Sequence, residues 1–156
     1  RMKQRDLWPS GWSETEMAYF AGLFDGDGYV GIQVDSRDGN FLYAAHVTNT
    51  DPRPLVRLRE LFGGGICPEH RKQYGCIWKW TIYGRRLDRF LAAIAPYLII
   101  KKDQVDVFFR ARQLTCRGAQ RHSSESRRVL MAAVLGLKEL KRQKFPELPT
   151  GGESVK

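Results

Sequence analysis

The chain has 156 residues and a mass of 18.0 kDa, which is a typical length for one domain. Its 26 Lys and Arg outnumber its 17 Asp and Glu, giving a formal charge of +9, and 42% of its residues are hydrophobic. This composition excludes a disordered basic tail and favours a globular domain that binds a polyanion, nucleic acid above all.

Residues 1–12 precede the first predicted helix and are interpreted as an N-terminal arm of mixed charge, without the apolar segment of a secretory signal. No apolar run approaches the roughly 20 residues of a membrane span, so no membrane partner is expected. The three cysteines are odd in number and widely spaced, which favours free thiols. We therefore expect an unsecreted, intracellular protein in a reducing compartment, either bacterial cytoplasm or an organelle matrix.

The first helix is predicted to begin after Ser13, where a capping box with Glu16 precedes an apolar run to Phe24. The helix is expected to stop at the segment Asp25-Gly26-Asp27-Gly28. Two carboxylates at the negative end of a helix are unfavourable unless a cation joins them. The pattern therefore indicates a site for Mg²⁺ or Mn²⁺, with a polar helix stop as the alternative.

Spacing excludes two other metal sites. An EF-hand loop with its turn glycine at Gly28 would require acidic ligands at the positions of Leu23 and Val34. Cys67, His70 and Cys76 do not form a CxxC pair, and no second pair exists to complete a zinc site.

The rest of the chain alternates between period-2 segments and helical segments. Hairpins of strands are predicted at 29–35 with 41–49 and at 66–69 with 76–83, and helices at 55–62, 85–95, 101–114 and 123–144. The fold class is thus α+β: an αββαββα core with one four-stranded antiparallel sheet, helices on one face and further C-terminal helices. The domain is expected to span 13–145, and a flexible tail to span 146–156. The tryptophans of the fourth strand are expected to face the helices, although tryptophan can also line a nucleic-acid surface.

The segment Phe20-Ala21-Gly22-Leu23-Phe24-Asp25-Gly26-Asp27-Gly28 resembles the signature of the LAGLIDADG homing endonucleases. The segments 47–52 and 96–102 resemble the same family in order and spacing, and the resemblance covers roughly residues 14–140. Only one signature is present. In this family one copy implies a homodimer through the motif helix, and a two-fold dimer implies a pseudo-palindromic target.

The resemblance also implies roles for individual residues. Asp27 and the Gly26 carbonyl match the metal ligands, with Mg²⁺ as cofactor, Mn²⁺ as a substitute, and Ca²⁺ binding without supporting cleavage. Asn49 is expected to orient the attacking water, while Arg53 and Lys101 stabilise charge on the phosphate. The dimer interface is expected at positions spaced by three and four along the helix: Ala18, Ala21, Gly22 and Asp25.

The open face of the sheet is expected to lie in the major groove of double-stranded DNA, where side chains reach base edges. The candidates from the first hairpin are Gln33, Asp35, Arg37, Asn40, Leu42, Ala44 and His46. Those from the second hairpin are Glu69, Arg71, Lys72, Gln73, Ile77, Lys79 and Thr81. Basic residues of the last helix, Lys141 among them, are further candidates for phosphate contacts.

The function implied is a site-specific homing endonuclease that binds a long pseudo-palindromic DNA target as a homodimer and hydrolyses both strands with divalent metal, leaving a staggered break. Two alternatives remain open. One is an RNA maturase of the same fold, with intron RNA as partner, and the other is a non-cleaving DNA-binding regulator. The presence of Asp27 favours cleavage.

Overall fold

The computed structural model of the chain describes residues 11–37, 39–73, 75–115 and 124–143. Its elements, in chain order, are α1 (Glu14–Asp27), β1 (Gly28–Val34), β2 (Phe41–Asn49), α2 (Arg53–Phe62), β3 (Gly65–Arg71), β4 (Gly75–Tyr83), α3 (Gly84–Ile94), the 3₁₀ turn η2 (Ala95–Tyr97), α4 (Lys102–Thr115) and α5 (Ser124–Arg142). The predicted α+β class and αββαββα order are confirmed. Most of the predicted arm and the whole predicted tail lie outside the described residues.

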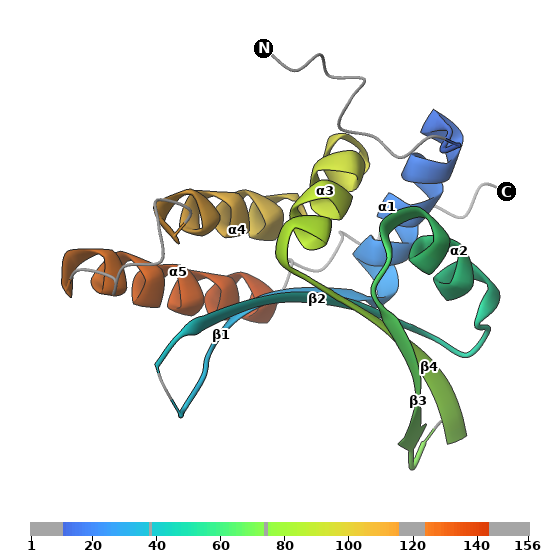
Figure 1. Cartoon of the computed structure of the whole chain (residues 1–156), viewed down its shortest axis with the longest axis horizontal. Coiled ribbons are helices and arrows are strands. Elements are labelled where there is room, and N and C mark those ends of the chain that lie inside the picture. The colour runs from blue at the N-terminus through green and yellow to red at the C-terminus, as the bar shows by residue number, and fades with distance from the viewer. Residues whose placement is uncertain (1–10, 38, 74, 116–123, 144–156) are drawn as a thin grey trace, which may run out of the picture.

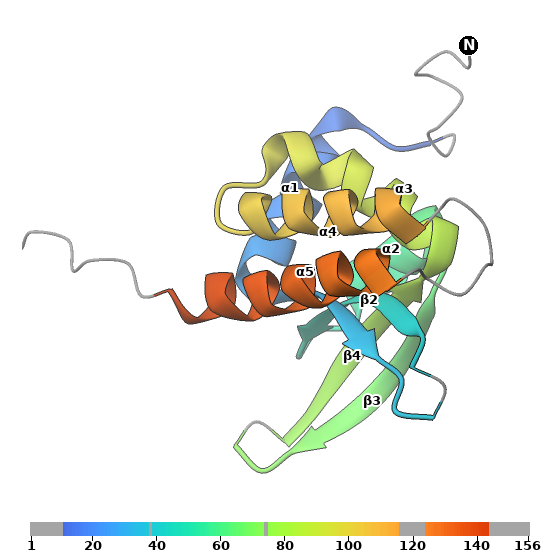
Figure 2. The same ribbon diagram turned by 90° about the vertical axis from the view of Figure 1, so that its left-hand side faces the viewer.

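The four strands form one antiparallel sheet in the order β1-β2-β4-β3. Each hairpin pairs within itself, and the two hairpins join where β2 lies beside β4, with Ala45 opposite Ile82. The five α-helices of the described residues all lie on one side of the sheet, which bends like an arch and leaves its other face concave and open (Figure 1). Figure 2 shows α4 and α5 stacked beside β1, with the β3–β4 hairpin projecting beyond the helices.

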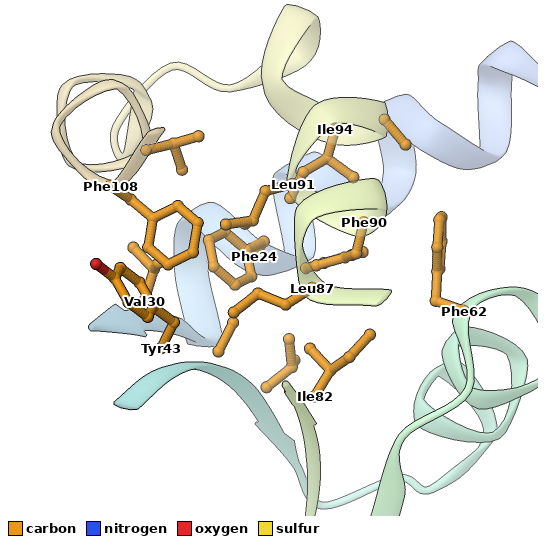
Figure 3. Packing of buried hydrophobic residues seen from close by; sticks show 14 of the residues in the cluster. Phe24, Val30, Tyr43, Phe62, Ile82, Leu87, Phe90, Leu91, Ile94 and Phe108 are labelled. Atoms are coloured by element: carbon orange, nitrogen blue, oxygen red, sulfur yellow. The ribbon is translucent and has the colours of Figure 1, made fainter. Parts of the chain in front are cut away.

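The core lies between the sheet and the helices (Figure 3). Phe90 of α3 is fully buried and makes edge-to-face contacts with Phe24, Phe62 and Trp80, with ring centroids 5.5, 5.2 and 5.0 Å away. Trp80 is 0% exposed, and its indole N–H donates to the Gly63 carbonyl at 2.8 Å. The prediction that the tryptophan face of the fourth strand packs on the helices is therefore confirmed, and the opposite face is free for a ligand.

The start of α1 confirms the predicted capping box. The Ser13 hydroxyl accepts from the Glu16 N–H at 3.1 Å, and the Glu16 carboxylate accepts from the Ser13 N–H at 3.1 Å. The end of the helix also lies in the predicted segment, because α1 continues through Gly26 to Asp27 and Gly28 is its C-cap. Within the described residues no helix is both long and apolar enough to span a bilayer.

Candidate active site and nucleic-acid interface

Asp25 is 8% exposed and joins the end of α1 to the beginning of α4. Its carboxylate accepts three backbone N–H groups, from Ile99 at 2.8 Å, Ile100 at 3.2 Å and Lys101 at 2.9 Å. The Lys101 ammonium also donates to the Asp25 carbonyl. A helix that would otherwise end in two uncompensated acids thus receives a cation and three donors from its own chain. Asp25 needs no metal ion to be stable where it is.

Asp27 is exposed and lies on the other side of the same helix end. It lines a pocket of about 330 Å³ together with Thr48, Asn49, Thr50, Arg71 and Ile77. Within the described part of the chain, its carboxylate has no hydrogen bond or ion pair of 4 Å or less. The structure therefore brings Asp27 and Asn49 together, as predicted, and leaves the Asp27 oxygens available to an external ligand.

Asn49 and Arg53 are held by the turn that leads into α2. The Asn49 side-chain oxygen accepts from the Asp51 N–H at 2.9 Å, and Asn49 remains beside Asp27 in the pocket. Arg53 instead grips Asp51 through Nε at 2.9 Å and Nη2 at 2.5 Å, and its side chain is 87% exposed. Hydrogen bonds from Arg53 lower the pKa of Asp51 to about 2. The structure does not bring Arg53 into the Asp27 pocket, so the four predicted catalytic residues are not all adjacent.

Lys101 lines a second pocket, of about 290 Å³, between β1, α4 and α5. The same pocket is lined by Tyr29, Gln104 and Lys141. The Lys141 ammonium donates to the Val30 carbonyl at 2.6 Å and lies 3.7 Å from the centre of the Tyr29 ring. Burial lowers the pKa of Lys101, and burial together with the charge of Lys101 lowers the pKa of Lys141 to about 8. Lys101 and Lys141 thus form a compact two-lysine cluster near the point where α1 ends at Asp27 and β1 begins.

This second pocket contains residues that sequence reasoning missed. Gln104 is 8% exposed, and its side-chain oxygen has no partner among the described residues. Tyr29 stacks on His46, with ring centroids 4.7 Å apart and planes 14° apart. The alternation of Tyr29 with Gln33 along the first strand could have placed Tyr29 on the open face. Nothing in the sequence indicates that α5 would bring a lysine onto this ring.

The predicted DNA-contacting residues lie on the open face of the sheet or at its hairpin tips. Seven are exposed, namely Gln33, Arg37, Asn40, Leu42, Arg71, Lys72 and Gln73, and six are partly buried, namely Asp35, Ala44, His46, Glu69, Lys79 and Thr81. Ile77 is the exception. It lies on the same face but is only 6% exposed, and it lines the Asp27 pocket. Ile77 is therefore not presented to a base in this conformation.

The charges on this face are arranged in pairs. Arg37 bonds Asp35 at 2.9 Å, and Glu69 is shared between Arg71 at 3.1 Å and Lys79 at 3.7 Å. Burial, with a smaller effect of nearby cations, lowers the pKa of His46 to about 4, so its imidazole is neutral at physiological pH. The open face thus offers hydrogen-bonding groups and cations to a polyanion, with acids that orient the arginines.

Three comparisons relate this geometry to known proteins. No protein-family model and no curated protein matches the chain. Among solved structures, the archaeal intron-encoded homing endonuclease I-Vdi141I complexed with DNA matches 86% of this chain and 89% of its own, with a TM-score of 0.70 and 16% identity. The protein has the fold of the LAGLIDADG homing endonucleases. The resemblance stated from the signature is confirmed at the level of fold.

Two further neighbours show how the LAGLIDADG fold is used in chains of different length. The homing endonuclease I-TnaI matches 81% of this chain and 93% of its own, with a TM-score of 0.63 and 21% identity. The LAGLIDADG meganuclease I-AabMI, bound to uncleaved DNA, matches 78% of this chain but only 44% of its own, with a TM-score of 0.64 and 17% identity. This chain therefore corresponds to less than half of the longer neighbour.

The motif helix of this LAGLIDADG fold presents only part of the predicted interface stripe. Ala21 is 0% exposed and Asp25 is 8% exposed, so both face the interior of the subunit. Ala18 and Gly22 are exposed, and a side chain added at Gly22 or Gly26 would meet no atom of the subunit within 4 Å. The small residues of α1 that the subunit leaves exposed along this side are Ala18, Gly22 and Gly26.

The donor set at the end of α1 suits a hard divalent cation. Asp27 offers a free carboxylate, and the Gly26 carbonyl lies in the last helical turn, where carbonyls lack N–H partners within the helix. No cluster of three or more His, Cys, Asp and Glu side chains exists within the described residues. One subunit therefore fits a metal ion only if the remaining ligands come from elsewhere, such as phosphate oxygens, water or a second subunit.

Proposed function

We propose that this protein is a site-specific DNA endonuclease that acts as a homodimer on a pseudo-palindromic target and hydrolyses both strands, leaving a staggered break. The observation that carries the proposal is the exposed and unpaired carboxylate of Asp27, which the LAGLIDADG-like helix delivers to a pocket at the open sheet face. An exposed acid at that position is only mildly unfavourable beside the helix C-terminus, and it is useful for hydrolysis of a phosphodiester. The DNA-bound states named for I-Vdi141I and I-AabMI support the choice of substrate.

The concave sheet is proposed to lie in the major groove. A two-stranded ribbon fits that groove, and amide and guanidinium side chains can form paired contacts with base edges. Gln33, Asn40 and Arg37 are exposed for this purpose in and around the first hairpin. Because the net charge is +9, the affinity for DNA should fall steeply as salt is added.

Asp27 and the Gly26 carbonyl would hold the divalent cation, Mg²⁺ or Mn²⁺. When bound, such an ion supplies a water of lowered pKa and stabilises charge on the phosphate. Asn49, fixed through its side-chain oxygen on the Asp51 N–H, presents its amide group beside Asp27 and can orient that water. Lys101, whose ammonium donates to the Asp25 carbonyl at the same helix end, would supply positive charge to a phosphate bound at Asp27.

A second copy of the chain is proposed to cover α1. Gly22 and Gly26 each cost the helix about 1 kcal/mol relative to alanine, and no neighbour inside the subunit requires them. Close approach of another helix would explain both glycines. The match to 44% of I-AabMI supports the same arrangement, because two copies of this chain would equal one such protein in length. Replacing Gly22 with Leu should leave the subunit folded and reduce the sedimentation coefficient to that of a monomer.

The proposed function is tested by selection from a randomised double-stranded DNA library. With Mg²⁺ or Mn²⁺ we expect cleavage of a palindrome-like site, and with Ca²⁺ we expect binding to the same site without cleavage. Sequencing of both cut strands then gives the stagger. Tight binding to a structured RNA without any DNA cleavage would overturn the proposal in favour of a maturase, and metal-independent DNA binding without cleavage would favour a regulator.

A further inference from the structure

The arginine that shares a pocket with Asp27 comes from β3 and not from the start of α2. Arg71 lines the same 330 Å³ pocket as Asp27 and Asn49, whereas Arg53 does not. We propose that Arg71 contacts the phosphate that is cut and stabilises its charge during hydrolysis, a role that the family resemblance assigns to Arg53. This inference rests on the proposed endonuclease function and deepens it.

The contacts of Arg71 orient the side chain without using up its donors. Its Nε donates to Glu69 at 3.1 Å, and its two terminal amino groups have no partner among the described residues. The Glu69 carboxylate is shared with the Lys79 ammonium at 3.7 Å, so it neutralises neither cation completely. Glu69 thus holds Arg71 through Nε alone. The two terminal amino groups of the guanidinium can form a paired contact with two phosphate oxygens.

Arg71 and Asp27 bring opposite charges to one pocket. Both residues face one pocket, yet they form no ion pair at 4 Å or less. A phosphate group has oxygens for the guanidinium on one side and for a cation held by Asp27 on the other. The pocket therefore has the charge pattern that a phosphodiester near a metal ion requires: a free acid, a polar amide and a free guanidinium.

Arg53 lacks each of these properties. Two of its nitrogens are committed to Asp51, at 2.9 and 2.5 Å, and its side chain is 87% exposed. To act on a phosphate beside Asp27, Arg53 would have to leave this bidentate pair. Arg71 already lines the pocket, and its terminal amino groups have no hydrogen bond to break among the described residues.

The experiment compares Arg71→Gln with Arg53→Gln on the selected DNA target, with Arg59→Gln on the exposed side of α2 as the matched control. Single-turnover cleavage is measured at saturating protein with Mg²⁺, and the dissociation constant is measured separately with Ca²⁺. We expect Arg71→Gln to slow cleavage by at least about 100-fold while weakening binding by less than about 5-fold, as for loss of one group that stabilises the transition state. Arg71→Lys should restore part of the rate, since it keeps the charge without the fork. Arg59→Gln should change neither quantity.

Two results would overturn the role of Arg71 alone. One is an Arg71→Gln variant that cleaves as fast as the wild type at saturating protein. That result would make Arg71 a DNA-binding residue only. The other is a greater loss of rate in Arg53→Gln than in Arg71→Gln. A wild-type protein that binds DNA and never cuts it, in Mg²⁺ or Mn²⁺, would instead refute the proposed function and this role with it.

Discussion

The two aspartates at the end of α1 lie two residues apart and have opposite environments. Asp25 is 8% exposed and accepts three backbone N–H groups from the segment before α4. Asp27 is exposed, and within the described residues it has neither a hydrogen bond nor an ion pair. Residues two apart on a helix point in nearly opposite directions, so a single turn can present one acid to the core and one to the outside.

This difference distinguishes an acid that stabilises the fold, Asp25, from an acid that is available to a ligand, Asp27. The chain compensates the Asp25 end of the helix with its own donors and with Lys101. Among the described residues it leaves the Asp27 carboxylate without a hydrogen bond or ion pair, at the open face of the sheet. A side chain whose partners are all internal should affect stability when it is changed, and one without internal partners should affect activity.

The largest effect is expected for Asp27→Asn. The substitution removes the charge while keeping the size of the side chain, so cleavage with Mg²⁺ should fall at least about 1,000-fold, equal to about 4 kcal/mol of transition-state stabilisation. The free energy of unfolding should stay within about 0.5 kcal/mol of wild type, because no internal contact is lost. A plasmid cleavage assay measures the loss of activity, and urea denaturation measures the free energy of unfolding. A large loss of stability in Asp27→Asn would remove the contrast with Asp25.

The next effect is expected for Asp25→Ala. Three N–H groups would lose a charged acceptor, which should lower the free energy of unfolding by about 2–4 kcal/mol. Asp25→Asn is the matched control: it keeps one acceptor oxygen and should lose less. Urea denaturation followed by tryptophan fluorescence measures both. Equal stability of all three proteins would show that the junction between α1 and α4 does not depend on this carboxylate.

A smaller effect is expected for His46→Gln. The pH dependence of its stability tests the burial of the His46 ring on the open face, separately from any contact with DNA. Burial holds its pKa near 4 in the folded protein, below its usual 6.5, so the unfolded chain binds the proton first as pH falls. Wild type should therefore lose about 1–2 kcal/mol of stability between pH 6.5 and 4, after allowance for the half-exposed ring. His46→Gln should not show this loss. Parallel pH profiles for the two proteins would contradict a neutral, partly buried imidazole.

Local patterns predicted much of this molecule. The capping box of Ser13, the strand alternation and the nine-residue segment ending at Gly28 gave the helix start, the sheet and the resemblance to LAGLIDADG endonucleases. The contact between Asp25 and Lys101 was not predictable, because it joins residues 76 positions apart through the packing of α4. The burial of Ala21 likewise depends on which side of α1 meets the core.

The basic residue of the candidate site shows the same limit. Arg53 follows Asn49 closely in the sequence, which led to its predicted role. In the structure its side chain forms an ion pair with Asp51, two residues earlier. Arg71 is remote in sequence from both Asn49 and Asp27, and it reaches their pocket only because β3 and β4 pair in the observed register beside β2. Pairing of strands far apart in the chain decided the composition of the pocket.

We propose that each subunit contributes one Asp27 to the cutting of one strand. The most direct test is a heterodimer in which one subunit is wild type and the other carries Asp27→Asn, purified with two different tags and mixed with the selected target and Mg²⁺. We predict a nicked product with one strand cut and the other intact. Cleavage of both strands by this heterodimer, at the rate of the wild-type dimer, would contradict the account.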